Sequence, residues 1–211
     1  MVVYAVYWLV GIINLVCAFF FRELVRKITK ACLMPVLLGF YLVGTDSIMV
    51  LIVMALVFSW VGDVLLINKD KPVFFKLGLA SFLISHLYYL IAFLVFAGTF
   101  HLVTLIISLV IAIPLTVYLL KLLNPSKEMK IPVTAYAVVI TLMSLAALQL
   151  LVAHPCVATT LIFVGSLVYL FSDSLMAYLL FHTKPKHFNV ITMVPYIVAQ
   201  GCIVLGLVLG I

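Results

Sequence analysis

Two aspartates within long apolar runs are the residues whose type and position best suit chemistry. Asp63 lies in the run Ser47–Ile67 and Asp173 in the run Val157–Phe181. At about 1.5 Å of rise per residue, both lie roughly 6 to 12 Å from the same end of a helix bundle. A carboxylate in the hydrocarbon layer costs about 2.5–3.5 kcal/mol even on lenient insertion scales, so such residues commonly face a wet cavity and have a function. The alternative is a structural pair, or side chains that reach headgroup water.

A pair of carboxyl groups at one membrane depth suggests acid–base chemistry. A carboxyl group desolvated in an apolar pocket stays protonated near neutral pH, whereas a better-solvated partner ionises. Glycosidases use such a pair for hydrolysis through an oxocarbenium-like state. Basic residues beside an apolar pocket suit an amphiphile with a phosphate head and one long tail.

A few other polar residues lie at positions that could bring them to the same layer. His86 is deep in the run Val73–Phe96 with Tyr89 on its face, and Tyr196 and Gln200 form an i, i+4 pair in the run Phe188–Leu209. Each could equally be a hydrogen-bonding group for helix packing. Weaker candidates of the same kind are Asn14, Tyr136 and Ser144.

Several familiar chemistries lack their motifs in this chain. There is no His-Glu-x-x-His, Cys-x-x-Cys, Gly-x-Ser-x-Gly or glycine-rich phosphate loop. Only His86 among five histidines is deep in an apolar run, so we expect no metal site. The Gly-x-Gly-Asp pattern of membrane aspartyl proteases fails at Trp60.

The composition excludes a soluble fold and favours an all-α membrane protein. Hydrophobic residues make up 68% of the 211 and charged residues only 9%, against roughly 25% charged in soluble domains. The apolar runs are continuous rather than alternating, which excludes a β-barrel. We therefore expect one polytopic domain, residues 1–211, of eight transmembrane helices, the second being the shortest: Tyr4–Phe21, Ile28–Val43, Ser47–Ile67, Val73–Phe96, Leu102–Lys121, Ile131–Leu151, Val157–Phe181 and Phe188–Leu209.

The basic residues predict the orientation in the membrane. All twelve Lys and Arg fall in or beside alternate connections, and the intervening connections contain none. By the positive-inside rule these basic connections are cytoplasmic and both termini are on the non-cytoplasmic side. The net charge of +6 is thus an orientation signal, with an attraction to anionic headgroups, and no nucleic-acid partner is expected. The basic ranges are Arg22–Lys30, Lys69–Lys76, Lys121–Lys130 and Lys184–Lys186.

Several short motifs recur in a family-specific order over the last six apolar runs. They are Ser59–Leu66 (SWVGDVLL), Gly78–Phe82 (GLASF), His86–Tyr89 (HLYY), Gly165–Ser174 (GSLVYLFSDS) and Tyr196–Gly201 (YIVAQG). In order and spacing they resemble the YhhN-like lysoplasmalogenase family. One departure is Ala31, where family members often have proline after the lysine that opens the second run.

This resemblance implies an integral membrane hydrolase without a cofactor. Its substrate is a lysophospholipid, the lysoplasmalogen, whose vinyl ether bond is cleaved to a fatty aldehyde and glycerophosphoethanolamine or glycerophosphocholine. The two catalytic aspartates of the family correspond to Asp63 and Asp173. The resemblance also implies the site neighbours Ser59, His86, Tyr89, Tyr196 and Gln200.

Joined to the residues, the resemblance predicts acid catalysis in the cytoplasmic half of the membrane. One aspartate protonates the enol-ether carbon remote from oxygen, and the other, ionised, stabilises the oxocarbenium and helps water attack. The sequence leaves open which aspartate is the acid. For the phosphate we expect Lys30 with one or more of Arg26, Lys76 and Lys184, although these cations could simply follow the positive-inside rule.

Two other functions are compatible with the same residues. Asp63, His86 and Asp173 could form the proton relay of a proton-coupled carrier or lipid-binding protein. The chain could also hydrolyse another lipid ether, ester or epoxide, because family likeness does not determine the leaving group. The headgroup and chain-length preference, the oligomeric state, and the choice between a bacterial inner membrane and a eukaryotic endomembrane stay open.

Overall fold

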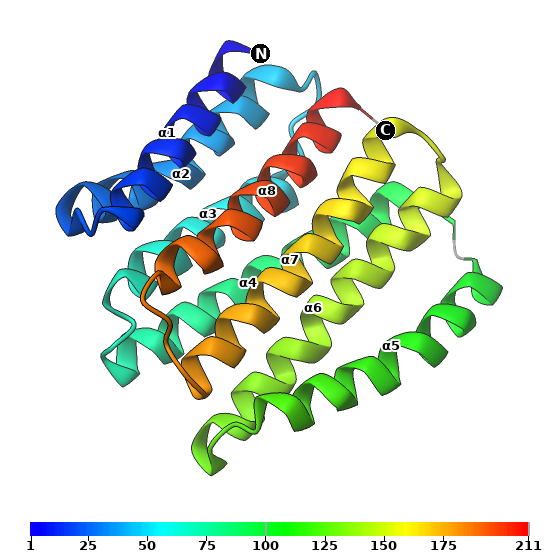
Figure 1. Ribbon diagram of the computed structural model, residues 1–211. Helices are drawn as coiled ribbons and strands as arrows, with labels where there is room; N and C mark the ends of the chain where they lie inside the picture. The colour runs from blue at the N-terminus through cyan, green and yellow to red at the C-terminus, as the bar shows by residue number, and fades with distance from the viewer. Residues whose placement is uncertain (100, 211) are drawn as a thin grey trace.

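The apolar runs form eight α-helices within residues 1–99 and 101–210, which the computed structural model describes (Figure 1). All eight helices of this part of the chain are long and apolar enough to cross a membrane, and no strand occurs in it, as predicted. Phe100 and Ile211 lie outside the described residues. The helices are α1 (Val2–Phe19), α2 (Glu23–Gly44), α3 (Val50–Leu65) with the 3₁₀ turn η1 (Leu66–Asn68), α4 (Pro72–Ala97), α5 (Leu102–Leu123), α6 (Lys127–Ala153), α7 (Val157–Phe181) and α8 (Phe188–Leu209).

The largest differences from the predicted boundaries are at basic helix ends. Helix α2 begins at Glu23 instead of Ile28, and α6 begins at Lys127 instead of Ile131. Charged side chains end an apolar run but not a helix, because their backbone hydrogen bonds are kept while the charges reach water. The prediction that the second helix is the shortest was wrong, since α2 has 22 residues and α3 has 16.

The chain runs up and down, so alternate connections gather at opposite ends of the bundle. Both termini lie at one end, and the α1–α2, α3–α4, α5–α6 and α7–α8 connections lie at the other (Figure 1). These four connections and the helix turns next to them contain all twelve Lys and Arg. We call this the basic end of the protein.

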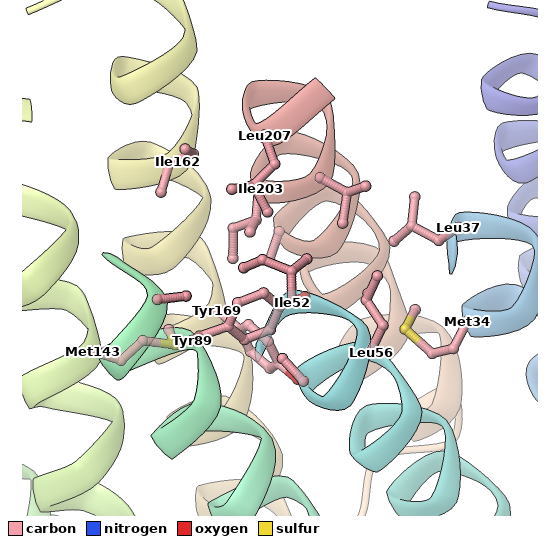
Figure 2. Close-up of a cluster of buried hydrophobic side chains, with 14 of the residues drawn as sticks. Met34, Leu37, Ile52, Leu56, Tyr89, Met143, Ile162, Tyr169, Ile203 and Leu207 are labelled. Atoms are coloured by element: carbon pink, nitrogen blue, oxygen red, sulfur yellow. The ribbon is translucent and has the colours of Figure 1, made fainter. Parts of the chain in front are cut away.

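The core lies around α8, which is the most thoroughly buried helix of the described residues. Figure 2 shows side chains from α2, α3, α4, α6, α7 and α8 converging there, among them Tyr89, Tyr169 and Ile203. Large aromatic groups fill the space between α3 and α4 on one side and α7 and α8 on the other. The buried hydroxyl and amide groups of Ser59, Tyr89, Tyr169 and Gln200 come from these four helices.

A close approach between α3 and α4 brings Asp63 next to α4. A Cβ atom on Gly62 would lie 2.6 Å from the ring of Phe82, so only glycine allows this packing. Helix α4 itself begins with Pro72 at its first position and ends at Gly98, whose φ of +62° is left-handed. Proline at the start and glycine at the end are the usual helix boundaries.

Candidate active site

A polar cavity of about 470 Å³ opens at the basic end and has both Asp63 and Asp173 in its wall. Its lining comes from α2, α3, η1 and the residues after it, α4, α7 and α8. The two predicted aspartates thus meet one space, although 110 residues separate them. The other charged lining residues are Glu23, Arg26, Lys27, Lys30, Lys69, Asp70 and Lys71.

Asp63 is held by a cation and a phenol. Lys30 Nζ lies 3.1 Å from Asp63 Oδ1, and the Tyr196 hydroxyl donates to Oδ2 at 2.6 Å. The carboxylate is 1% exposed and the lysine side chain 13% exposed. The cation and the hydrogen bond from the phenol each favour the ionised form of this carboxyl group.

Asp173 has a different set of neighbours, and none of its direct contacts is a permanent cation. The Tyr136 hydroxyl donates to Oδ2, and His86 Nε2 lies 3.9 Å from the same oxygen. Its side chain is 11% exposed, which is more than that of Asp63. The two carboxyl groups therefore differ in both charge environment and access.

The orientation of His86 is determined by its backbone contact. Nδ1 lies 2.5 Å from the Phe82 carbonyl oxygen, which can only accept, so Nδ1 carries the proton. In the neutral ring Nε2 is then an acceptor, and it is buried with no hydrogen-bond partner among the described residues. This acceptor faces Asp173, and the ring packs against Tyr136 and Tyr169.

Ser59, Tyr89 and Gln200 form a buried network that does not line the polar cavity. Gln200 Nε2 donates to Ser59 Oγ at 3.2 Å and to the Tyr169 hydroxyl at 3.0 Å, and Gln200 Oε1 accepts from Tyr89 at 3.1 Å. All four side chains are fully buried. The network joins α3, α4, α7 and α8 and so supports the helices that hold the two aspartates.

The four basic residues considered for phosphate binding have separate partners. Lys30 pairs with Asp63, and Arg26 binds Glu23 one turn earlier at 2.5 Å. Lys76 lies 3.8 Å from Glu128 and Lys184 lies 2.9 Å from Asp70, and neither lysine lines the polar cavity.

Lys69 is a cavity cation that the sequence did not distinguish from its neighbours. Its ammonium donates to Asn189 Oδ1 at 3.0 Å and lies 4.0 Å from the centre of the Phe188 ring. Burial, and then the positive charges of Lys30 and Arg26, lower the pKa of Lys69 to about 7. Lys69 therefore gains its full charge only below about neutral pH or when an anion binds beside it.

Two further spaces follow the polar cavity, and each shares lining residues with the one before it. A junction cavity of about 40 Å³ is lined by Asp173, Tyr136 and Met176, and it shares Asp173 and Met176 with the polar cavity. Beyond it, an apolar groove of about 360 Å³ lies between α5, α6 and α7. Asp173 thus stands where a charged space meets an apolar one.

Sequence reasoning ranked Tyr136 too low and missed Tyr169 as well as Lys69. Tyr136 was visible as a polar residue in an apolar run, but nothing in its spacing relates it to Asp173. Tyr169 could have been found from its place four residues before Asp173, on the same helix face. Among the described residues, no three His, Cys, Asp or Glu side chains lie close enough together to hold a metal ion.

A family model matches most of the chain. The model of the YhhN family covers residues 25–207, which include both cavity aspartates and the helices that hold them. Searches of curated proteins and of solved structures found no match. On this range the chain belongs to the YhhN family.

Proposed function

We propose that the protein is a lysoplasmalogenase, which hydrolyses the vinyl ether bond of a lysoplasmalogen by acid catalysis. The observation that carries this proposal is the position of Asp173, in the wall of both the charged polar cavity and the apolar junction cavity. A vinyl ether joins the alkyl chain to the polar glycerol phosphate. A lipid with its head in the first space and its chain toward the second therefore brings this bond to Asp173.

Asp173 is the proton donor in this proposal, and Asp63 is the ionised carboxylate. Lys30 stabilises a negative charge on Asp63, whereas Asp173 has only Tyr136 and the neutral acceptor of His86 within reach. An acceptor facing a carboxyl oxygen matches a carboxyl group that carries a proton. The greater exposure of Asp173 also suits the group that must touch substrate.

The reaction then proceeds in balanced steps. The Asp173 proton adds to the enol-ether carbon remote from oxygen, which leaves an oxocarbenium ion and an Asp173 carboxylate. Asp63 stabilises the cation, a water molecule attacks the carbon bonded to oxygen, and the proton it loses returns to Asp173 through His86 Nε2. The resulting hemiacetal breaks its C–O bond to give a fatty aldehyde and the glycerophospho alcohol.

The basic residues of the polar cavity suit the phosphate of the headgroup. Arg26, Lys27, Lys69 and Lys71 line the cavity together with Lys30. Because Lys30 already pairs with Asp63 and Arg26 with Glu23, the phosphate site centres in this proposal on Lys69. By the positive-inside rule the basic end faces the cytoplasm, so the lipid comes from the cytoplasmic leaflet and both termini lie on the other side.

The test uses purified protein in nanodiscs with a lysoplasmalogen in D₂O. We expect fatty aldehyde with one deuterium on the carbon next to the carbonyl, because the proton is added to carbon. Hydrolysis of an ester or an epoxide leaves no such label, so the product also distinguishes the other hydrolases. A protein that moves protons without releasing aldehyde would instead be a carrier.

Variants of the two aspartates test their roles. A positioned general acid commonly contributes about 10²–10⁴-fold, so Asp173→Asn and Asp63→Asn should each lower kcat by at least about 100-fold. Asp46→Asn is the matched control, because Asp46 is exposed in the α2–α3 connection at the opposite end. Near-normal turnover by a folded Asp173→Asn or Asp63→Asn protein would remove that residue from the mechanism.

A further inference from the structure

The apolar groove lies next to the junction cavity that has Asp173 in its wall. The groove and the junction cavity share Thr116 and Leu119 of α5, Thr141 of α6 and Leu170 of α7. The junction cavity in turn shares Asp173 with the polar cavity. The three spaces therefore lie in a row, from the basic end, past the proposed acid, to the space between α5, α6 and α7.

Four of the five side-chain hydroxyls that line the groove are already bonded within the protein itself. The hydroxyls of Thr116 and Thr141 bond to each other at 3.2 Å, and those of Ser108 and Ser144 each donate to a main-chain carbonyl of their own helix. Apart from Thr104 at the far end, the remaining wall is made of Leu, Ile, Ala and Phe side chains. Such a surface offers nothing to a polar ligand and favours a hydrocarbon.

The groove has the length of one lipid tail. On α6 the junction cavity and the groove together extend from Tyr136, beside Asp173, to Leu148, about 18 Å at 1.5 Å per residue. The hydrocarbon core of a bilayer is about 30 Å thick, so the chains of one leaflet span about 15 Å. The groove also runs away from the basic end, as a tail must when its headgroup lies there.

We infer that the apolar groove between α5, α6 and α7 binds the alkyl chain of the lipid substrate, and that this chain enters sideways from the bilayer past α5. The inference rests on the proposed function, to which it adds a chain-binding subsite. Helix α5 lies at the edge of the bundle (Figure 1) and buries only Ser108, Ala112 and Leu123. A lipid therefore reaches the groove directly from the hydrocarbon layer, and its tail never crosses water.

A tryptophan series along the α5 wall tests this path. Leu119→Trp, Ala112→Trp and Thr104→Trp fill the groove near Asp173, at its middle and at its far end, with steps of about 10–12 Å. We expect Leu119→Trp to lower kcat/KM for every long-chain substrate at least tenfold. Ala112→Trp should do so for long chains but spare short ones, and Thr104→Trp should affect only the longest.

A matched control and a binding measurement separate this inference from the proposed function. Val110→Trp on the same helix faces away from the groove and should leave the chain-length profile unchanged. The affinity of each variant for saturated ether lysophospholipids, which lack the vinyl bond, is measured as a function of chain length. Affinity losses that follow the tryptophan position support the subsite even if no aldehyde is formed, in which case only the proposed reaction fails.

The inference is overturned if the tryptophan variants and Val110→Trp share one chain-length profile in both measurements. The groove would then hold only bilayer lipid. It is equally overturned if Leu119→Trp changes the oligomeric state while chain-length dependence stays unaltered, since the groove would then be a contact between two copies.

Discussion

The two sides of α7 are built in opposite ways. Toward α8 the backbones are in contact, since a Cβ atom on Gly165 would lie 3.0 Å from the Ala199 carbonyl oxygen and one on Gly206 would lie 2.5 Å from the Ala158 carbonyl oxygen. Toward α5 the same helix borders the apolar groove. Asp173 stands on a helix that is tightly packed on one side and open to hydrocarbon on the other.

This difference suggests that the two sides of α7 have separate roles around the proposed acid, Asp173. An acid must be held within fractions of an ångström of its target, which requires a rigid support. A membrane lipid must enter and leave, which requires a loosely packed wall. The α8 side leads through Tyr196 to Asp63 and Lys30, whereas the α5 side leads to the bilayer.

The largest expected effect comes from removing one partner of the buried ion pair on the rigid side. Lys30→Met leaves the Asp63 carboxylate without its cation, and the loss of one partner of a buried pair costs about 3–5 kcal/mol in unfolding free energy. Lys30→Met/Asp63→Asn should recover most of this loss, because no lone charge remains. Denaturation of the purified variants checks both values, and a double variant no more stable than Lys30→Met contradicts the pairing.

The next effect compares helix packing on the two sides. Gly206→Ala pushes a methyl group against the α7 backbone and should cost about 1–3 kcal/mol in unfolding free energy. Val110→Ala on the exposed face of α5 should stay within about 0.5 kcal/mol. Equal shifts in the melting temperatures of the two variants would mean that α5 and α8 are packed alike.

A smaller effect concerns the support of Asp173 from α6. Tyr136→Phe removes the hydroxyl that donates to Asp173, so kcat should fall about tenfold, equivalent to about 1.4 kcal/mol, while KM stays similar. Tyr118→Phe on the exposed face of α5 is the control. An unchanged kcat in Tyr136→Phe would assign the positioning of Asp173 to His86 alone.

The smallest effect is a pH dependence of the proposed phosphate site. Lys69 loses its charge as pH rises through about 7, so KM for substrate should rise several-fold between pH 6 and 8 (about one unit either side of this pKa). The charged groups near it are Arg26, Lys30, Lys184 and Asp70. Lys69→Arg keeps its charge and should show a flat KM over this range. A Lys69→Arg profile that matches the wild type would place the titration elsewhere.

Lys69 should make the folded protein more stable as pH rises, whereas it should make substrate binding weaker. The folded protein has released this proton above about pH 7, whereas the unfolded chain keeps it up to about pH 10.5. Because the unfolded state binds more protons in this window, the free energy of unfolding rises with pH across it. The cost of burying the charged Lys69 is greatest below about pH 7 and declines as pH rises.

Much of the fold followed from the sequence because a bilayer imposes simple demands. Continuous apolar runs had to become helices, since every backbone group must find its hydrogen bond within the hydrocarbon. Helix ends at charged residues were less predictable, as Glu23 and Lys127 show. A charge reaches the surface from inside a helix as readily as from a loop, so hydropathy does not locate such an end.

For the site, the sequence indicated which residues are costly in a membrane but not which ones meet. Asp63, Asp173, His86 and Tyr196 were all identifiable from their depth and the motifs around them. Their pairings were not, because nothing in the sequence related Lys30 to Asp63, against which it lies. The difference between the two carboxyl groups depends on these partners, which come from other helices.

The sequence by itself determined that the chain forms apolar helices, that its cations gather at one end, and that two acids lie at a similar depth near that end. These properties depend on residue type and on position along one helix, which are local quantities. Only the tertiary structure decided that Asp63 receives a lysine, that Asp173 receives a phenol and an imidazole, and that a groove leads away from one of them. Such contacts depend on which helices pack together and how closely. Small residues such as Gly62 and Gly206 allow a short distance between two helices, but the sequence does not say which helix will pack there.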